Sequence, residues 1–324
     1  MPNLLTNPRL SHFSVEAGGI VALADLGTIA ERTALMGTSS WVDILVVAPG
    51  IHLHQKSADL ANAGGELPPT AALTTGYVFR VENQAMVGWL QSVGKPGNLV
   101  EVFVDENKGF SIFASGPLAT VTYLLAPIFT IAAVIFLGIY NEWWTFGIIF
   151  VLIFARLVNV AVIKRRAKTG WKGASEPGVT GDLLILLSQD RWIRMRGMVD
   201  DLKAVTSGQW LEDMAAVESF ACAGATLLVY VTAALSANAS TLGNVILMAL
   251  LFIEVGLLGL SNKFVLGIQL HGRIVKQVGQ PKAYKRRLDL ANELIEETGR
   301  RDWAIGLGMV PADSGTEKPT KVVL

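Results

Sequence analysis

The feature that most constrains this chain is an apolar run at residues 118–140 that contains no Asp, Glu, Lys or Arg. At a rise of 1.5 Å per residue, a helix of this length spans about 35 Å, and the hydrocarbon core of a bilayer is about 30 Å thick. A second apolar run follows at residues 145–163, after the short polar segment 141–144. The two runs together predict a transmembrane helical hairpin.

A second pair of apolar runs lies at residues 219–237 and 242–260, joined by the polar segment 238–241. The composition agrees with four membrane spans, because only 17% of the residues are charged, compared with about 25% in soluble domains. The sequence therefore predicts an α-helical membrane protein with four transmembrane helices in two hairpins. The lipid bilayer is then its first partner.

Charge and cysteine content exclude several classes of protein. The chain has 27 basic and 27 acidic residues, whereas a nucleic-acid partner requires a clustered positive excess. The single cysteine, Cys222, lies in the third apolar run and rules out an intramolecular disulfide and a cysteine-based zinc or iron–sulfur site. We expect neither a nucleic-acid partner nor a metal or other cofactor.

The polar parts of the chain predict a small α+β domain outside the membrane. In the N-terminal part, the Val- and Ile-rich run 41–48 and the alternating residues 51–54 are typical of two strands. Residues 99–104 and 110–113, around a glycine-containing turn, predict a hairpin. Residues 14–36 contain enough charges to favour a soluble or interfacial helix, although a fifth membrane segment stays open.

The loop between the two membrane hairpins predicts a second β-hairpin, at residues 182–187 and 191–196, followed by helices. An isolated two-stranded hairpin is marginally stable in water, so we expect these strands to join the N-terminal strands. After the fourth span, the pattern favours a helix to about residue 278, a break, and an amphipathic helix at 282–298.

The distribution of basic residues predicts the orientation. Lys164, Arg165, Arg166, Lys168 and Lys172 open the central loop, and more basic residues follow the fourth span, whereas the two short turns contain none. Since positively charged loops stay in the cytosol, both termini and the central loop are predicted to be cytosolic. The expected divisions are a cytosolic α+β domain (1–117), a first hairpin (118–163), a cytosolic loop (164–217), a second hairpin (218–262) and a cytosolic helical tail (263–324).

The run Gln189-Asp190-Arg191-Trp192-Ile193-Arg194-Met195-Arg196-Gly197-Met198-Val199-Asp200-Asp201-Leu202-Lys203-Ala204-Val205-Thr206-Ser207-Gly208-Gln209-Trp210 and the apolar hairpin after it carry a resemblance. This part, about a third of the chain, resembles a family of uncharacterised integral membrane proteins of filamentous fungi. The resemblance implies a membrane protein from a eukaryotic microbe and implies no particular chemistry.

Two charged residues inside the predicted spans mark a candidate site. Arg156 lies about 17 Å along the second span and Glu254 about 18 Å along the fourth, counted from their external ends. A charge at this depth costs at least about 2.5 kcal/mol on insertion scales, so it usually faces a partner or water. We therefore expect an Arg156–Glu254 ion pair, with Asn159 one turn away. The group is either structural or a polar transport site.

Other candidate residues lie outside the spans. Five acidic residues are expected near the cytosolic mouth: Asp200, Asp201, Glu212, Asp213 and Glu218. A magnesium–diphosphate site is disfavoured because Ala204 stands where an aspartate-rich motif requires its last carboxylate, so helix faces and caps are the simpler interpretation. His52 and His54 share one face of the predicted strand, but no carboxylate at a set spacing supports a metal site.

Three functional classes follow from these patterns. A binding, scaffold or assembly role ranks first, because no catalytic motif is present. A transporter or channel subunit that uses Arg156, Asn159 and Glu254 is the first alternative. An enzyme that acts on an apolar or lipid substrate, with the acidic residues as candidates, is the second. Small residues on the third and fourth spans also suit a homo-oligomer or a membrane-protein partner.

Overall fold

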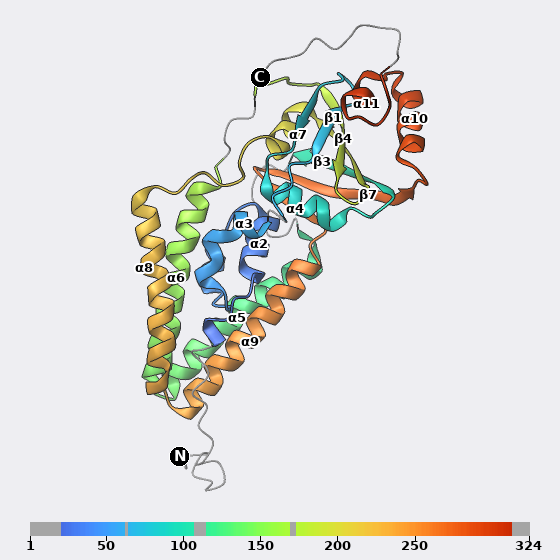
Figure 1. The fold of residues 1–324 in the computed structure, drawn as a ribbon. Coiled ribbons are helices and arrows are strands. Elements are labelled where there is room, and N and C mark those ends of the chain that lie inside the picture. Colours follow the sequence, from blue (N-terminus) through green and yellow to red (C-terminus); the bar gives the residue numbers. More distant parts are fainter. Residues whose placement is uncertain (1–20, 62–63, 107–114, 169–172, 313–324) are drawn as a thin grey trace.

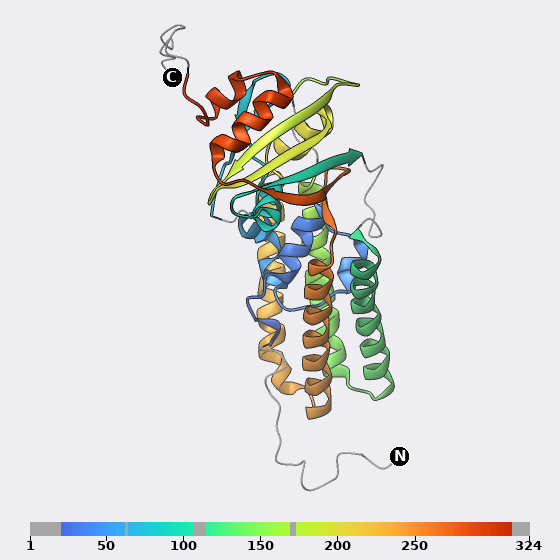
Figure 2. The ribbon, with the colours of Figure 1, turned by 90° about the vertical axis from the view of Figure 1, so that its right-hand side faces the viewer.

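The computed structural model describes residues 21–61, 64–106, 115–168 and 173–312. It has two parts, a bundle of long apolar helices and a sheet-containing domain at one end of that bundle (Figures 1 and 2). The chain passes from one part to the other several times, so neither part is a contiguous stretch of sequence.

Four helices of the described residues are long and apolar enough to cross a membrane. They are α5 (Pro117–Ile139), α6 (Trp143–Arg166), α8 (Ala216–Leu235) and α9 (Thr241–Lys263). Local signals set their starts: α5 begins at a proline, whose missing N–H is not needed there, and Ser240 caps α9 by accepting from the Gly243 N–H at 3.0 Å. The four predicted apolar helices are confirmed.

The helices pack across the two predicted hairpins rather than within them. The main partner of α5 is α9, and the main partner of α6 is α8. The short turns that follow α5 and α8 lie together, because the Ser240 hydroxyl donates to Glu142 at 2.7 Å. From this closed end the two helix pairs diverge toward the sheet domain, which leaves a wedge-shaped space between them (Figure 1).

The N-terminal segment fills that wedge. It consists of α2 (Thr28–Met36), the 3₁₀ helices η1 (Trp41–Leu45) and η2 (Ile51–Lys56), and α3 (Ser57–Ala61). Its buried apolar residues share one core with the four long helices. We refer to residues 21–61 as the wedge segment. Figure 1 shows it between the two helix pairs.

The wedge segment corrects two expectations. Residues 41–48 and 51–54 are not strands of a cytosolic domain at 1–117, because η1 occupies residues 41–45, residues 46–48 have no regular structure, and η2 occupies residues 51–54. The Val- and Ile-rich composition reflects packing inside the bundle, with Val46, Val47 and Ala48 fully buried, and β propensity cannot distinguish this burial from a strand. Ser40 and Asp43 form a capping box that starts η1. Within residues 14–36, the described helix α2 has 9 residues and is too short to cross a bilayer.

The second part contains a seven-stranded sheet with the order β2-β1-β4-β5-β3-β7-β6. The strands are β1 (Pro69–Ala72), β2 (Val78–Arg80), β3 (Asn98–Glu106), β4 (Thr180–Leu187), β5 (Arg191–Met198), β6 (Gly267–Leu270) and β7 (Arg273–Ala283). Strands from before α5, between α6 and α8, and after α9 therefore form one sheet. The predicted β4–β5 hairpin and its union with N-terminal strands are confirmed.

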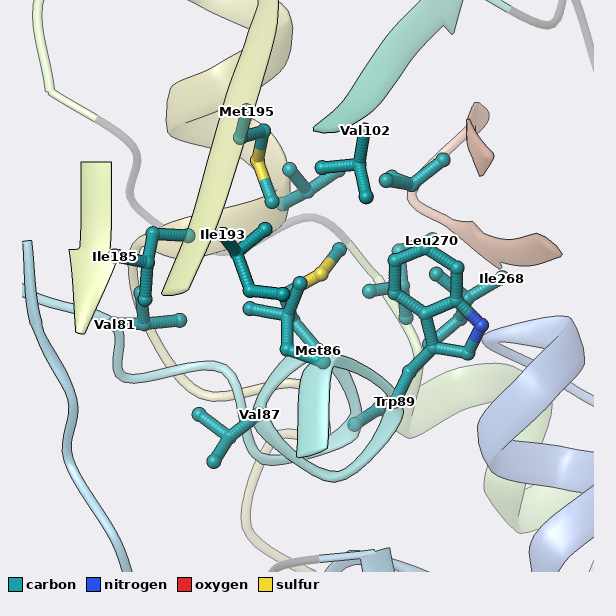
Figure 3. Close-up of a cluster of buried hydrophobic side chains, with 14 of the residues drawn as sticks. Val81, Met86, Val87, Trp89, Val102, Ile185, Ile193, Met195, Ile268 and Leu270 are labelled. Carbon is teal, nitrogen blue, oxygen red and sulfur yellow. The ribbon is translucent and has the colours of Figure 1, made fainter. Parts of the chain in front are cut away.

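Helices cover both faces of the sheet. On the side toward the bundle, α4 (Gln84–Val93) and α7 (Val199–Thr206) pack against a core of strand residues. In Figure 3, Met86 and Trp89 of α4 lie among Ile193 and Met195 of β5 and Ile268 of β6. On the other side, α10 (Arg287–Thr298) and α11 (Asp302–Gly306) cover part of the sheet.

The C-terminal part differs from its prediction. The chain after α9 forms the β6–β7 hairpin instead of a helix to residue 278, and α10 begins at Arg287. The turn residues His271 and Gly272 both have positive φ, 47° and 74°, which suits a tight hairpin turn and not a helix. Strand β3 pairs with β5 and β7. Its predicted partner at residues 110–113 lies outside the described residues.

The contact between the wedge segment and the sheet domain can be tested at Gly88. A Cβ atom there would lie 2.0 Å from the carbonyl oxygen of Ala61, so Gly88→Ala must push α4 away from α3. We expect a loss of about 1–3 kcal/mol in the free energy of unfolding, measured by thermal unfolding in detergent. Gly147→Ala on α6 is the matched control, because its Cβ meets nothing within 4 Å. Equal stability of the two variants would contradict this packing.

Candidate functional site

Arg156 lies in the middle of α6 and is only 1% exposed. Its Nε donates to the backbone oxygen of Asp43 at 3.1 Å, and one terminal nitrogen lies 2.8 Å from Nδ1 of His54. Both partners belong to the wedge segment. Among the described residues no ion pair joins Arg156 to Glu254, so the predicted direct pair is wrong.

The contacts of His54 define its tautomer. Because a guanidinium can only donate, Nδ1 of His54 accepts from Arg156, and the ring proton is on Nε2. Nε2 lies 2.9 Å from the Thr33 hydroxyl, which itself donates to the Ile29 carbonyl. His54 is fully buried, and a neutral ring satisfies all of these contacts.

Asp43 supplies the buried carboxylate that Arg156 requires. It accepts from the Tyr123 hydroxyl at 2.5 Å and from the Ser40 N–H at 2.6 Å. The guanidinium of Arg32 lies 4.5 Å from the centre of the Tyr123 ring and donates to Ser261 on α9. Tyr123 of α5 thus links the charges of Asp43 and Arg32, and Arg156 joins this group through the Asp43 backbone.

Glu254 lies on α9 at a similar depth and is fully buried. One carboxyl oxygen contacts the Thr130 hydroxyl of α5, which also lies 2.6 Å from the Leu45 carbonyl. A hydroxyl has one proton and a carbonyl only accepts. If Thr130 donates to Leu45, a protonated Glu254 supplies the proton for the other contact. The backbone N–H groups of Val47 and Ala48 also interact with this carboxyl group.

The third predicted residue, Asn159, also binds the wedge segment. Gln55 donates to both the backbone and the side-chain oxygen of Asn159 at 3.0 Å, and accepts from Arg166 at 3.1 Å. Among the described residues, no hydrogen bond or ion pair therefore joins Arg156, Asn159 and Glu254 to one another. Each contacts a different part of the segment between Asp43 and Gln55.

The sequence analysis missed most of this network. Its other members are Arg32, Asp43, His54, Tyr123 and Thr130. Asp43 did offer a signal, because it is the one charged residue in the apolar run 41–48. No signal in the sequence identifies Asp43 as the partner of Arg156, since the two residues are 113 positions apart.

The five acidic candidates fall into two separate groups. Asp201 pairs with Arg273 at 2.8 Å, and Asp200 accepts from Ser175 and from the Glu176 N–H. Near the start of α8, Glu218 pairs with Arg165, which also contacts Glu212 and the Asp213 backbone. In the described part of the chain, no three His, Cys, Asp or Glu side chains are grouped to hold a metal. His52 contacts Asp25 and not His54.

The sheet domain holds a second charged cluster, beneath α10. Arg194 donates to Asp182 and to Glu297, at 2.6–3.0 Å. Burial by itself lowers the pKa of Arg194, but the hydrogen bonds with both carboxylates outweigh it and raise this pKa. The hydrogen bond from Arg194 is the main cause that lowers the pKa of Glu297. A pocket of about 280 Å³ beside this cluster has both basic and acidic walls.

The arrangement can hold the helices, the wedge segment and the sheet domain in fixed relative positions. Most polar groups of the network contact internal partners among the described residues, although a few buried oxygens of the bundle, such as Thr145 Oγ1 and Asn244 Oδ1, have none. The second carboxyl oxygen of Glu254 is buried and forms no hydrogen bond of standard geometry within the described residues, although the Val47 and Ala48 N–H groups interact with the carboxyl group. This oxygen is the position at which a further proton or a hydrogen-bond donor would bind.

The proton count at Glu254 predicts different results for two substitutions. Glu254→Gln should keep the fold, because the amide N–H donates to Thr130 in place of the carboxyl proton. Glu254→Leu leaves the Val47 and Ala48 amides without this acceptor and should cost about 1–3 kcal/mol of unfolding free energy. Thermal unfolding of both variants in detergent measures this. If Glu254→Gln destabilises the protein as much as Glu254→Leu does, the negative charge of Glu254 is required and the proposed protonation of its carboxyl group is wrong.

The ion pairs of α10 predict a pH dependence at Glu297. Its folded pKa is lowered from an ordinary value of 4.5, so its stabilisation is complete above that value and is lost as the pH falls through the lower folded pKa. Since Glu297 is 49% exposed, Glu297→Gln should cost less than about 1 kcal/mol at pH 7. The difference from wild type should shrink below pH 4.5. Glu296→Gln, on the exposed side of α10, is the control for thermal unfolding.

Comparison with known proteins gives no relative from which a function could be inferred. The chain matches no protein-family model, no curated protein and no solved structure. The fold and the polar network are therefore the basis for assigning a role.

Proposed function

We propose that this chain is a multi-pass membrane protein whose sheet domain lies in the cytosol and acts as a binding or scaffold module. The described ends of α5, α6, α8 and α9 that are nearest to the sheet domain all lie at the same end of the bundle (Figure 2). Lys164, Arg165 and Arg166 end α6 there, and Lys263 ends α9. Basic residues at this end support a cytosolic position for the sheet domain.

One observation supports a scaffold role in particular. The buried charges of the bundle contact the wedge segment, so they stabilise an anchor and do not line an open path. The wedge segment also contacts the sheet domain, since Trp210 donates its ring N–H to the Gly37 backbone at 2.9 Å. A firmly anchored domain suits the presentation of a binding surface to another membrane protein or to a second copy of the chain.

A transport role is the second candidate, and the buried second carboxyl oxygen of Glu254 favours it. In secondary transporters, coupling sites lie near the bilayer midplane, where interrupted helices meet a charged side chain. The interruption between η1 and η2 meets Glu254 in this way. The separation of the acidic candidates gives no similar support to an enzyme.

The orientation is tested by cysteine labelling in a Cys222→Ala background. Ala237 lies in the turn between α8 and α9, and Lys285 lies in the sheet domain; both are exposed. In sealed microsomes with the cytosolic side outward, an impermeant maleimide should label Lys285→Cys directly. It should label Ala237→Cys only after detergent is added. The reverse pattern would contradict the proposed orientation.

The choice between scaffold and transporter is tested in proteoliposomes that contain a pH-sensitive dye. A scaffold predicts proton flux equal to that of protein-free vesicles, both for wild type and for Glu254→Gln. It also predicts a stoichiometric protein partner, or a defined oligomer, in native mass spectra of the protein extracted with mild detergent. Flux that is present in wild type and lost in Glu254→Gln would favour transport.

A further inference from the structure

A second pocket lies where the bundle meets the sheet domain. It has a volume of about 440 Å³ and is formed by the ends of α2 and α6 and by the β6–β7 turn. Met36 and Leu270 give it an apolar wall, and Lys168 and Arg273 give it a basic rim. We call this the junction pocket. It shares no residue with the buried polar network around Arg156.

The position of the junction pocket along α6 corresponds to the headgroup layer of a membrane. The apolar part of α6 ends at Ile163, and the helix itself ends three residues later at Arg166, about 4.5 Å further at helical rise. Lys168 follows two residues beyond that end. The polar headgroup region extends about 5–8 Å beyond the hydrocarbon core on each side. Trp41, which is 57% exposed, lies beneath the Lys164 amine at 5.2 Å. Exposed tryptophan side chains are typical of this interfacial layer.

The charges around the junction pocket favour an anion. Arg273 is oriented by Asp201 through Nε and by the His271 carbonyl through one terminal nitrogen. Asp201 is the acidic side chain in contact with this rim, and Arg273 balances its charge. Lys168 is exposed and has no ion-pair partner among the described residues, so it leaves a net positive charge.

The pocket beneath α10 does not offer this combination. Three acidic side chains, Glu101, Glu293 and Glu297, belong to its walls. Its cations Arg194 and Lys282 are already bound to carboxylates. It also lies on the face of the sheet that is turned away from the bundle (Figure 1).

We propose that the junction pocket binds the phosphate group of an anionic lipid from the cytosolic leaflet. Lys168 and Arg273 contact the phosphate, and the apolar wall at Met36 and Leu270 contacts the glycerol and upper acyl carbons. Basic pockets at the cytosolic ends of membrane helices bind anionic headgroups by this combination of charge and apolar surface. The inference rests on the membrane orientation proposed above.

The test is native mass spectrometry of the full chain in a mild detergent, with added phosphatidylinositol 4-phosphate or phosphatidylcholine. We expect one anionic lipid per chain, bound about tenfold more tightly than phosphatidylcholine. Lys168→Glu should lower the affinity for the anionic lipid about tenfold, because it removes one favourable charge and adds a repulsive one. The exposed Lys285→Glu, outside the pocket, is the matched control and should leave binding unchanged.

Several outcomes would overturn the proposal. Equal binding of the two lipids, or unchanged binding in Lys168→Glu, would exclude an anionic-lipid site at the pocket. Displacement of the lipid by millimolar inorganic phosphate would identify a site for free phosphate instead. Lys168 is exposed at the end of α6, so its variant should fold; an unchanged unfolding temperature checks this. Lipid binding in detergent does not depend on the membrane orientation of the protein. A failure of this lipid-binding test is therefore distinguishable from a failure of the orientation test by cysteine labelling in microsomes.

Discussion

The structure depends on how the guanidinium of Arg156 is accommodated inside the bundle. A buried charge is strongly unfavourable unless hydrogen bonds and an opposite charge surround it. The Asp43 backbone, the His54 ring and the nearby Asp43 carboxylate provide these, and all of them belong to the wedge segment. Without this segment, two diverging helix pairs would enclose an unpaired charge. The segment therefore completes the membrane part and does not merely precede it.

The sequence predicts the four long helices because their signal is one-dimensional: length and apolar content suffice. It predicts the β4–β5 hairpin for a similar reason, since alternation between Ile193 and Met195 on one face and Trp192 and Arg194 on the other is local. It also selects Arg156 and Glu254 as buried polar groups. It cannot select their partners, because the insertion cost fixes the need for a partner and not its place in the chain.

The failures share one physical cause. Burial makes residues 41–48 apolar whether they form a strand or a 3₁₀ helix, so composition alone favoured the wrong structure. After α9, the predicted helix continues through His271 and Gly272, although these two residues form the turn of the β6–β7 hairpin. In both places tertiary contacts decide the backbone conformation. The helices α5 and α6 pack around η1, and β7 pairs with β3 while β6 pairs with β7.

The wedge segment joins the two parts of the molecule mechanically. Its middle contacts buried charges on α6 and α9, while Gly37 at the end of α2 packs so closely against Gln269 of β6 that a Cβ atom would lie 2.2 Å from the backbone oxygen. The junction pocket is bounded by this same contact. An occupant that moved the β6–β7 turn would therefore press on α2, and α2 is continuous in sequence with the residues around Asp43. A lipid at the membrane surface and the buried network would then share one structural element, which is the requirement for coupling between two sites.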